Sequence, residues 1–137
     1  IELKEYSLLF LIINNLKFFK ERLDNLKKLN LFSDENKEAM SKIINHLEEN
    51  HDPQIDEIPI DNKILDKVNK YASIKHIFNN INNDKHKLME IYDEIKKDLS
   101  SLGIDLKIEE LESQFSQDLN ENTFNQIKEL KKLQNIN

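Results

Sequence analysis

The last part of the chain decides the fold. Residues Ile104–Asn137 read IDLKIEELESQFSQDLNENTFNQIKELKKLQNIN. Two segments of this stretch repeat apolar residues every three or four positions, which is the period of an amphipathic helix. The first segment carries Ile104, Ile108, Leu111 and Phe115, and the second carries Phe124, Ile127 and Leu130, with Leu133 at the margin of its apolar face. The stretch therefore predicts a helical hairpin.

A short polar turn joins the two predicted helices. Asn120 is a good N-cap because its side chain can accept hydrogen bonds from the free backbone N–H groups of the first helical turn. Leu119 and Phe124 occupy the two positions of a hydrophobic staple, and Glu121 suits the positive end of the helix dipole. Two such helices bury little apolar surface between them. We therefore expect the hairpin to pack on the rest of the chain or on a partner.

The composition indicates an all-α protein. The chain has one Gly, two Pro and 34% charged residues, whereas β-proteins need more turn residues. Its 137 residues suffice for one domain with a real core, or for one domain plus an appendage. We predict an N-terminal helical bundle over residues 1–82, and a long helix followed by the C-terminal helical hairpin over residues 83–137.

Apolar periodicity and capping residues predict the helices of the bundle. The first helix runs from about Glu2 to Asn14 and is apolar nearly all round, as a central core helix is. Further helices are expected over residues 16–28, from the N-cap Ser33 to about residue 49, and from the N-cap Asp61 onwards. The apolar residues that follow continue this last helix or begin a separate short one: Ile74, Ile77, Phe78 and Ile81.

Two interruptions separate the predicted elements. Residues 50–59 hold both prolines and no helical period, which predicts a loop, with Ile55 and Ile58 as apolar anchors. The Asn-rich residues 79–84 predict a second loop or a frayed helix end, after which the C-terminal part begins.

A heptad-like repeat then predicts a long helix from about Asp84. Its apolar positions are Leu88, Ile91, Tyr92, Ile95, Leu99, Leu102 and Leu106. The apolar stripe changes phase near Gly103. This glycine is either the C′ residue at a helix end, or a residue inside the helix that destabilises it by about 1 kcal/mol relative to Ala. We expect a kink or a break there.

Charge and hydropathy exclude several classes of partner. The formal net charge is −6, and the basic stretch over residues 17–28 is interrupted by Glu21 and Asp24, so we expect no direct nucleic-acid binding. The longest apolar run, Leu8–Ile13, is far shorter than the roughly 20 residues of a membrane span. The chain lacks Cys and a visible targeting segment, which favours a cytoplasmic protein. It begins at Ile1 rather than Met, so we expect a piece of a longer protein.

Catalytic and metal-binding patterns are missing from the sequence. The four histidines, His46, His51, His76 and His86, do not stand at a zinc-binding spacing. The carboxylates of Glu109, Glu110 and Glu112 are typical of a solvated helix face. One glycine cannot form a phosphate-binding loop. We therefore expect no catalytic residue, no metal and no cofactor in this chain.

Recognition by a helix face remains. Helix-in-groove binding uses apolar anchors spaced three and four residues apart. The final predicted helix offers Phe124, Ile127 and Leu130, flanked by lysines. The same apolar stripe also suits packing within the hairpin, and a hairpin can do both because its apolar margins stay exposed.

The order of these motifs resembles the C-terminal helicase-binding domain of bacterial replicative DNA primase (the DnaG family). Three stretches carry the resemblance: the opening helix Glu5–Asn14, the apolar connector Leu31–Ser33, and the turn Leu119–Asn122 followed by the helical stretch Thr123–Leu130. The resemblance spans essentially the whole chain. One departure is Gly103, within the region that the family builds as a long helix.

The resemblance implies a function for each part. The bundle would be similar to the N-terminal domain of the hexameric replicative helicase and would modulate it, while the hairpin would dock on that helicase. The implied partner-binding residues are Leu119, Phe124, Ile127, Lys128, Leu130 and Lys131. The catalytic primase and zinc domains would precede this non-catalytic piece in a full-length DNA primase. The resemblance leaves open whether two copies exchange their hairpins in a swapped dimer.

Two other hypotheses stay open. The chain could be the N-terminal domain of the replicative helicase itself, because the two folds are alike, and self-association would mark it. It could also be a helical structural or surface protein with no role in replication.

Overall fold

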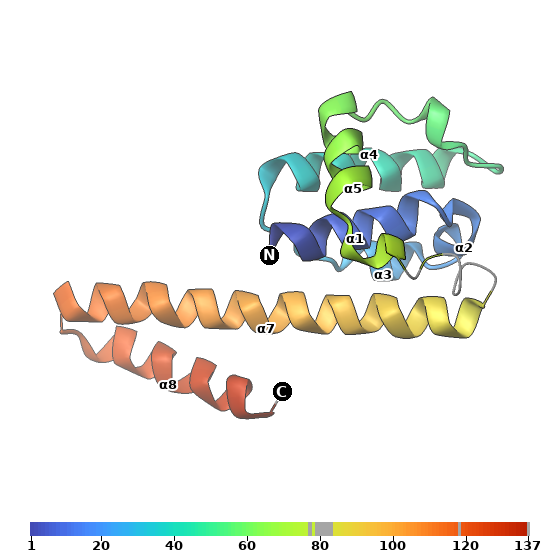
Figure 1. Cartoon of the computed structure of the whole chain (residues 1–137). Helices are drawn as coiled ribbons and strands as arrows, with labels where there is room; N and C mark the ends of the chain where they lie inside the picture. Colours follow the sequence, from blue (N-terminus) through green and yellow to red (C-terminus); the bar gives the residue numbers. More distant parts are fainter. Residues whose placement is uncertain (77, 79–83, 118, 137) are drawn as a thin grey trace. The chain divides into compact units, whose positions relative to one another are not determined.

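The structure is a computed structural model that describes residues 1–76, 78, 84–117 and 119–136 (Figure 1). These ranges contain helices and no strand, which confirms the predicted all-α fold. The helices are α1 (Glu2–Ile13), α2 (Leu16–Lys20), α3 (Leu23–Lys27), α4 (Asp34–Glu49), α5 (Asn62–Tyr71), α7 (Lys85–Gln117) and α8 (Glu121–Ile136), with 3-10 turns η1 (Ile55–Glu57) and η2 (Ser73–His76).

The chain forms two compact units, Ile1–Lys96 and Lys97–Asn137, so that α7 begins in the first and ends in the second. The boundary that we predicted after residue 82 lies outside the described residues and stays a prediction. The predicted loop over residues 79–84 lies outside them too, except for Asp84, as do the apolar residues Ile77 and Ile81.

Helix α1 is the centre of the first unit, as its all-round apolar pattern predicted. Every residue from Glu5 to Ile12 is buried. Helices α2, α4 and α5 and the turn η2 all contact it, and α5 lies across α1 and α4 (Figure 1). The start of α7 completes this core, since Leu88 and Tyr92 are buried and the Tyr92 ring centroid lies 5.2 Å from that of Phe19.

A buried carboxylate of α1 caps α4. Glu5 is 0% exposed and accepts hydrogen bonds from the backbone N–H groups of Phe32 and Ser33 and from Asn36 Nδ2, the last at 3.0 Å. We predicted that Ser33 would cap α4. Ser33 occupies the N-cap position, but its side chain makes no capping hydrogen bond. Glu5, a residue distant in sequence, instead accepts from the N–H of the N-cap residue Ser33 and of the preceding Phe32, because its buried carboxylate needs donors and these N–H groups need an acceptor.

The helix predicted over residues 16–28 is interrupted. It is found as α2 and α3, and Arg22 between them has the non-helical angles φ −124° and ψ 34°. The Arg22 guanidinium donates to the backbone oxygen of Phe18 at 3.1 Å and lies 3.8 Å from the centroid of the Phe18 ring. The Arg22 side chain thus uses the Phe18 oxygen that the Arg22 backbone N–H would use in a continuous helix. The spacing of the apolar residues does not predict this contact.

The loop before α5 follows the prediction more closely. Ile58 is buried and Ile55 is half-buried, so Ile58 is the stronger of the two expected anchors. Asp61 caps α5, because its Oδ1 accepts from the backbone N–H of Lys63 at 2.9 Å. After α5 the chain forms the separate short turn η2, one of the two alternatives left open by the sequence.

Helix α7 passes through Gly103 without a break, so the expected break is wrong, while the kink stays a prediction. The glycine does not adopt a positive φ, which a helix-ending C′ residue needs. The phase change has another cause. Tyr92 packs against Phe19 in the first unit, whereas Ile108 is buried within the second unit. The apolar stripe therefore changes side because the packing partner changes.

Candidate partner-binding hairpin

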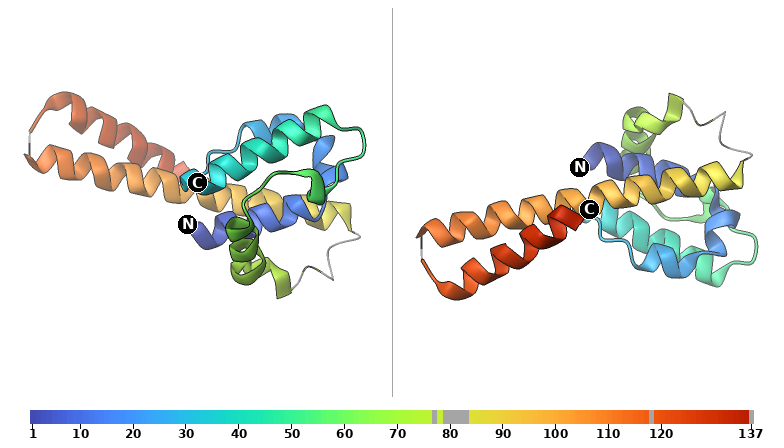
Figure 2. Two further views of the ribbon diagram at one scale, coloured as in Figure 1. Left: turned by 90° about the horizontal axis from the view of Figure 1, so that it is seen from above. Right: turned by 90° about the horizontal axis from the view of Figure 1, so that it is seen from below.

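The second unit is a hairpin of α7 and α8, which run side by side in opposite directions (Figure 2). Its interior is small, with Ile108, Leu111 and Ile127 buried. Asn120 caps α8 as predicted, because its Oδ1 accepts from the backbone N–H of Thr123 at 2.9 Å. An N-cap of this kind contributes about 1 kcal/mol to the helix it begins.

One long edge of the hairpin is joined by side-chain contacts, and we call it the closed margin. Lys131 Nζ lies 3.1 Å from Glu112 Oε1, and Gln134 donates a hydrogen bond to Asp105. At the turn end of the same edge, the rings of Phe115 and Phe124 lie 5.7 Å apart between centroids. These pairs fix the register of α8 on α7, although the exposed ion pair contributes at most about 1 kcal/mol.

The opposite edge is hollowed, and we call it the open margin. A groove of about 420 Å³ lies there, lined by carbon atoms of Lys107, Leu111, Asn125, Gln126, Glu129 and Leu130. Leu130 is half-buried. Leu133 follows Leu130 by three residues, so it lies on the same side of α8, and it is 48% exposed. The open margin thus presents apolar surface between polar rims.

The turn end of the hairpin exposes two large apolar side chains, and we call this region the tip. Leu119 is 77% exposed and Phe124 is 44% exposed. The predicted staple between them therefore buries little of Leu119, and Phe124 contacts Phe115 instead. Lys128 lies one turn along α8, with its Nζ 5.4 Å from the centroid of the Phe124 ring. The tip combines exposed apolar area with an adjacent cation.

The structure distributes the six predicted partner-binding residues over three environments. Leu119, Phe124 and Lys128 are exposed at the tip. Lys131 is exposed but paired with Glu112, and Leu130 lines the groove. Ile127 is only 6% exposed and packs inside the hairpin.

Sequence reasoning missed which residues support the tip. The ring of Phe115 packs against that of Phe124, and Glu112 forms an ion pair with Lys131. The antiparallel pairing of the two helices is the signal that could have found them. Once Phe115 is set opposite Phe124, a rise of about 1.5 Å per residue brings Asp105 opposite Gln134. The same pairing leaves Glu112 about 6 Å along the axis from Lys131, within reach of two long side chains.

The described residues offer no metal site. Among residues 1–76, 78, 84–117 and 119–136, no group of three His, Asp or Glu side chains could hold an ion. His46 has a packing role: it is 8% exposed, and its Nε2 accepts from the backbone N–H of Gln54 at 3.2 Å. His86 forms a pair with Glu90 at 3.0 Å on the surface of α7.

Within the described parts of the chain, no helix combines the length and the apolar character needed to cross a membrane.

Comparison with known proteins gives no relative. No family model, no curated protein and no solved structure matches the chain. The functional argument therefore depends on the motifs in the sequence and on the geometry of the hairpin.

Proposed function

We propose that this chain is a protein-interaction module, similar to the C-terminal domain of bacterial replicative primase, that docks primase on the hexameric replicative helicase through the hairpin. The observation that carries the proposal is the exposed tip formed by Leu119 and Phe124, with Lys128 beside it. The order of a helical bundle, a long helix and a terminal hairpin supports it, because this is the architecture that the resemblance implies.

The tip has the properties of a binding anchor. Large apolar side chains exposed together mark interaction sites more often than isolated ones do, and aromatic anchors dominate the energy of many interfaces. Burial of the exposed part of Phe124 in a partner would stabilise the complex at about 25 cal/mol per Å². Lys128 would speed the encounter with an acidic patch and fix its orientation. A protein partner also fits the net charge of −6 better than a nucleic acid does.

The other implied contact residues take different parts in this proposal. Ile127 holds α8 against α7 and so positions the tip. Lys131 does the same through its pair with Glu112. Leu130 contributes to the groove of the open margin rather than to the tip. The proposal therefore assigns direct contact to Leu119, Phe124 and Lys128.

In this function the chain acts in the cytoplasm without a cofactor, and it binds the N-terminal domain of the helicase. Primer synthesis would belong to catalytic and zinc domains elsewhere in a longer primase chain. The bundle in the first unit would modulate the helicase once the hairpin is bound.

Calorimetric titration of the chain into the replicative helicase of the same organism tests the proposal. Phe124→Asp is expected to lower the affinity at least 100-fold, about 2.8 kcal/mol, as loss of a central aromatic anchor does. Leu106→Asp is the matched control, because Leu106 is also 44% exposed but stands about 160° around α7 from Ile108, on the side away from α8.

Circular dichroism should show unchanged helicity for both variants. A chain truncated after Ser116 removes α8 and should not bind. Wild-type binding that survives either Phe124→Asp or the truncation would contradict docking through the hairpin, and the absence of wild-type binding would overturn the proposed partner.

A further inference from the structure

We propose that the open margin of the hairpin is a self-association surface, on which a second copy of this chain packs its own open margin about a twofold axis. The proposal concerns a different surface from the tip and does not depend on the proposed docking function. Its components are the groove, the exposed Leu133 and two oppositely charged side chains on the groove walls.

The groove presents apolar side chains at the edge of a helix pair, where a further helix could pack. Leu111 and Leu130 line it, together with the aliphatic parts of Lys107 and Gln126. Leu133, 48% exposed, adds apolar surface along α8. The hydrogen bond and the ion pair that join α7 to α8 lie at the closed margin instead. Two hairpins joined along their open margins would form a four-helix bundle with leucines at the centre.

The groove carries one positive and one negative side chain, so the grooves of two copies can pair opposite charges with each other. Lys107 lies on the α7 wall and Glu129 on the α8 wall. A twofold axis along the groove sets α7 of one copy over α8 of the other. Each Lys107 then approaches Glu129 of the other copy, and the pair occurs twice. A second copy carries the same lysine and glutamate at the same spacing, so it fits this charge pattern by its own sequence.

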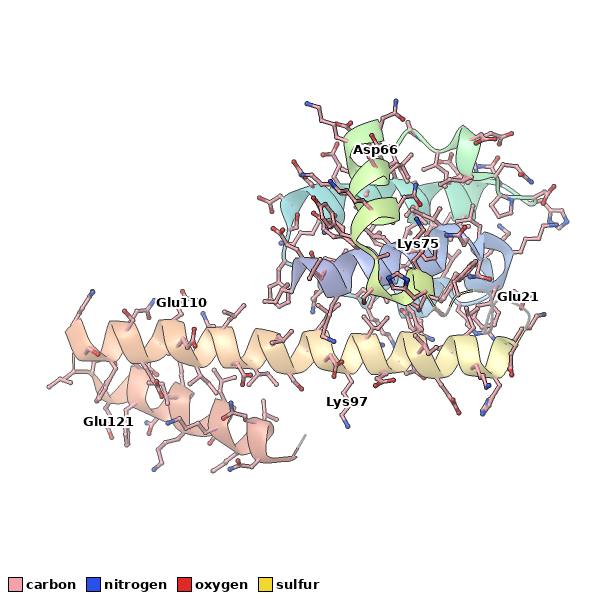
Figure 3. All side chains as sticks on the ribbon, viewed as in Figure 1. Glu21, Asp66, Lys75, Lys97, Glu110 and Glu121 are labelled. Carbon is pink, nitrogen blue, oxygen red and sulfur yellow. The ribbon has the colours of Figure 1, made fainter. Side chains whose placement is uncertain are left out.

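Both side chains are available for such a pair. Lys107 Nζ lies 3.6 Å from Glu110 and Lys132 Nζ lies 3.4 Å from Glu129, each within a single helix. Glu110 projects from the side of α7 away from α8 (Figure 3). All four side chains are more than half exposed, and exposed pairs of this spacing contribute only about 0.3–0.5 kcal/mol. Little free energy is therefore lost when these pairs within one helix are replaced by pairs between two copies.

The expected dimer is weak. The groove is lined by six residues, whereas a standard protein interface uses roughly 20–30 residues on each side. We expect a dissociation constant on the order of 10–100 μM, which corresponds to about −7 to −5.5 kcal/mol. Such a dimer would form at the high local concentrations of an assembly and would dissociate on dilution.

Sedimentation equilibrium of the whole chain from about 1 μM to 1 mM tests the proposal, since this range brackets the expected constant. Leu133→Glu should raise the dissociation constant at least 10-fold, because it places a charge on the apolar surface next to Leu130 that the second copy would cover. Leu106→Glu is the matched control: Leu106 is 44% exposed and lies on the other side of α7, so this variant should dimerise as the wild type does. Circular dichroism checks that both stay helical.

A charge exchange tests the twofold arrangement. Lys107→Glu and Glu129→Lys should each weaken the dimer about 5- to 10-fold, and the double variant should recover most of the wild-type affinity. A wild-type chain that stays monomeric up to 1 mM would overturn the proposal. So would a dimer that Leu133→Glu leaves intact, which is the behaviour of a swapped dimer, or a double variant that recovers nothing.

Discussion

The substitution Glu5→Gln tests whether the first unit depends on a cap supplied from outside α4. In the native protein one carboxylate oxygen accepts from the backbone N–H of Phe32, and the other accepts from Ser33 and Asn36. A glutamine of the same shape keeps one acceptor oxygen and turns an NH₂ group towards the remaining donor. At least one buried donor therefore loses its partner.

The magnitude follows from this count. Loss of one hydrogen bond to a charged group costs about 1.5–3 kcal/mol, and conversion of the two remaining bonds from a charged to a neutral acceptor adds roughly 0.5–1 kcal/mol. We expect Glu5→Gln to lower the free energy of unfolding by about 2–4 kcal/mol. This is a large part of the roughly 5–15 kcal/mol that stabilises a domain of ordinary size.

Urea titration monitored by circular dichroism measures the effect. With an m-value of about 2 kcal/mol per M, the midpoint should fall by about 1–2 M. Glu2→Gln is the matched control, because Glu2 lies exposed in the first turn of the same helix and should change the midpoint by less than about 0.3 M. Equal midpoints for the two variants would refute the argument that Glu5 caps α4.

Two further substitutions probe α7. Tyr92→Phe removes a buried hydroxyl that has no hydrogen-bond partner in the described structure, so it should stabilise the protein by about 1 kcal/mol in a urea titration. Burial raises the pKa of Tyr92, so above about pH 10 the unfolded chain ionises while the native one does not. Stability should then fall with pH by up to about 1.4 kcal/mol per unit, and less steeply in Tyr92→Phe; parallel profiles would contradict this. Gly103→Ala should stabilise α7 by about 0.5–1 kcal/mol, whereas destabilisation would indicate that the helix bends there.

The sequence predicted what depends on local patterns. Asn120 and Asp61 cap their helices as expected, because a cap needs only a suitable side chain next to the first helical turn. The central position of α1 followed from its all-round apolar character. The hairpin itself followed from two apolar stripes and a polar turn.

The failures come from contacts between residues far apart in the chain. Ser33 makes no side-chain cap, and its own N–H bonds to Glu5, because tertiary packing brings a buried carboxylate to that end of α4. The continuous helix at Gly103 was missed because a change of packing partner and a change of helix direction produce the same phase shift in the sequence. The candidate site has a related difficulty, because an apolar period does not show whether Ile127 faces the helix partner or the solvent; in the structure it is buried within the hairpin.

The hairpin fixes by residue count alone which side chains of α7 meet α8. Deletion of one residue between Leu111 and Phe115 would turn Phe115 by about 100° around α7 relative to Ile108, and so away from the ring of Phe124. Insertion of seven residues there would change this angle by only about 20° but would shift Phe115 about 10.5 Å along the axis, and a matching insertion in α8 would restore the contact. Hairpins of this design should therefore tolerate length changes when both helices change together, in steps of seven or eleven residues.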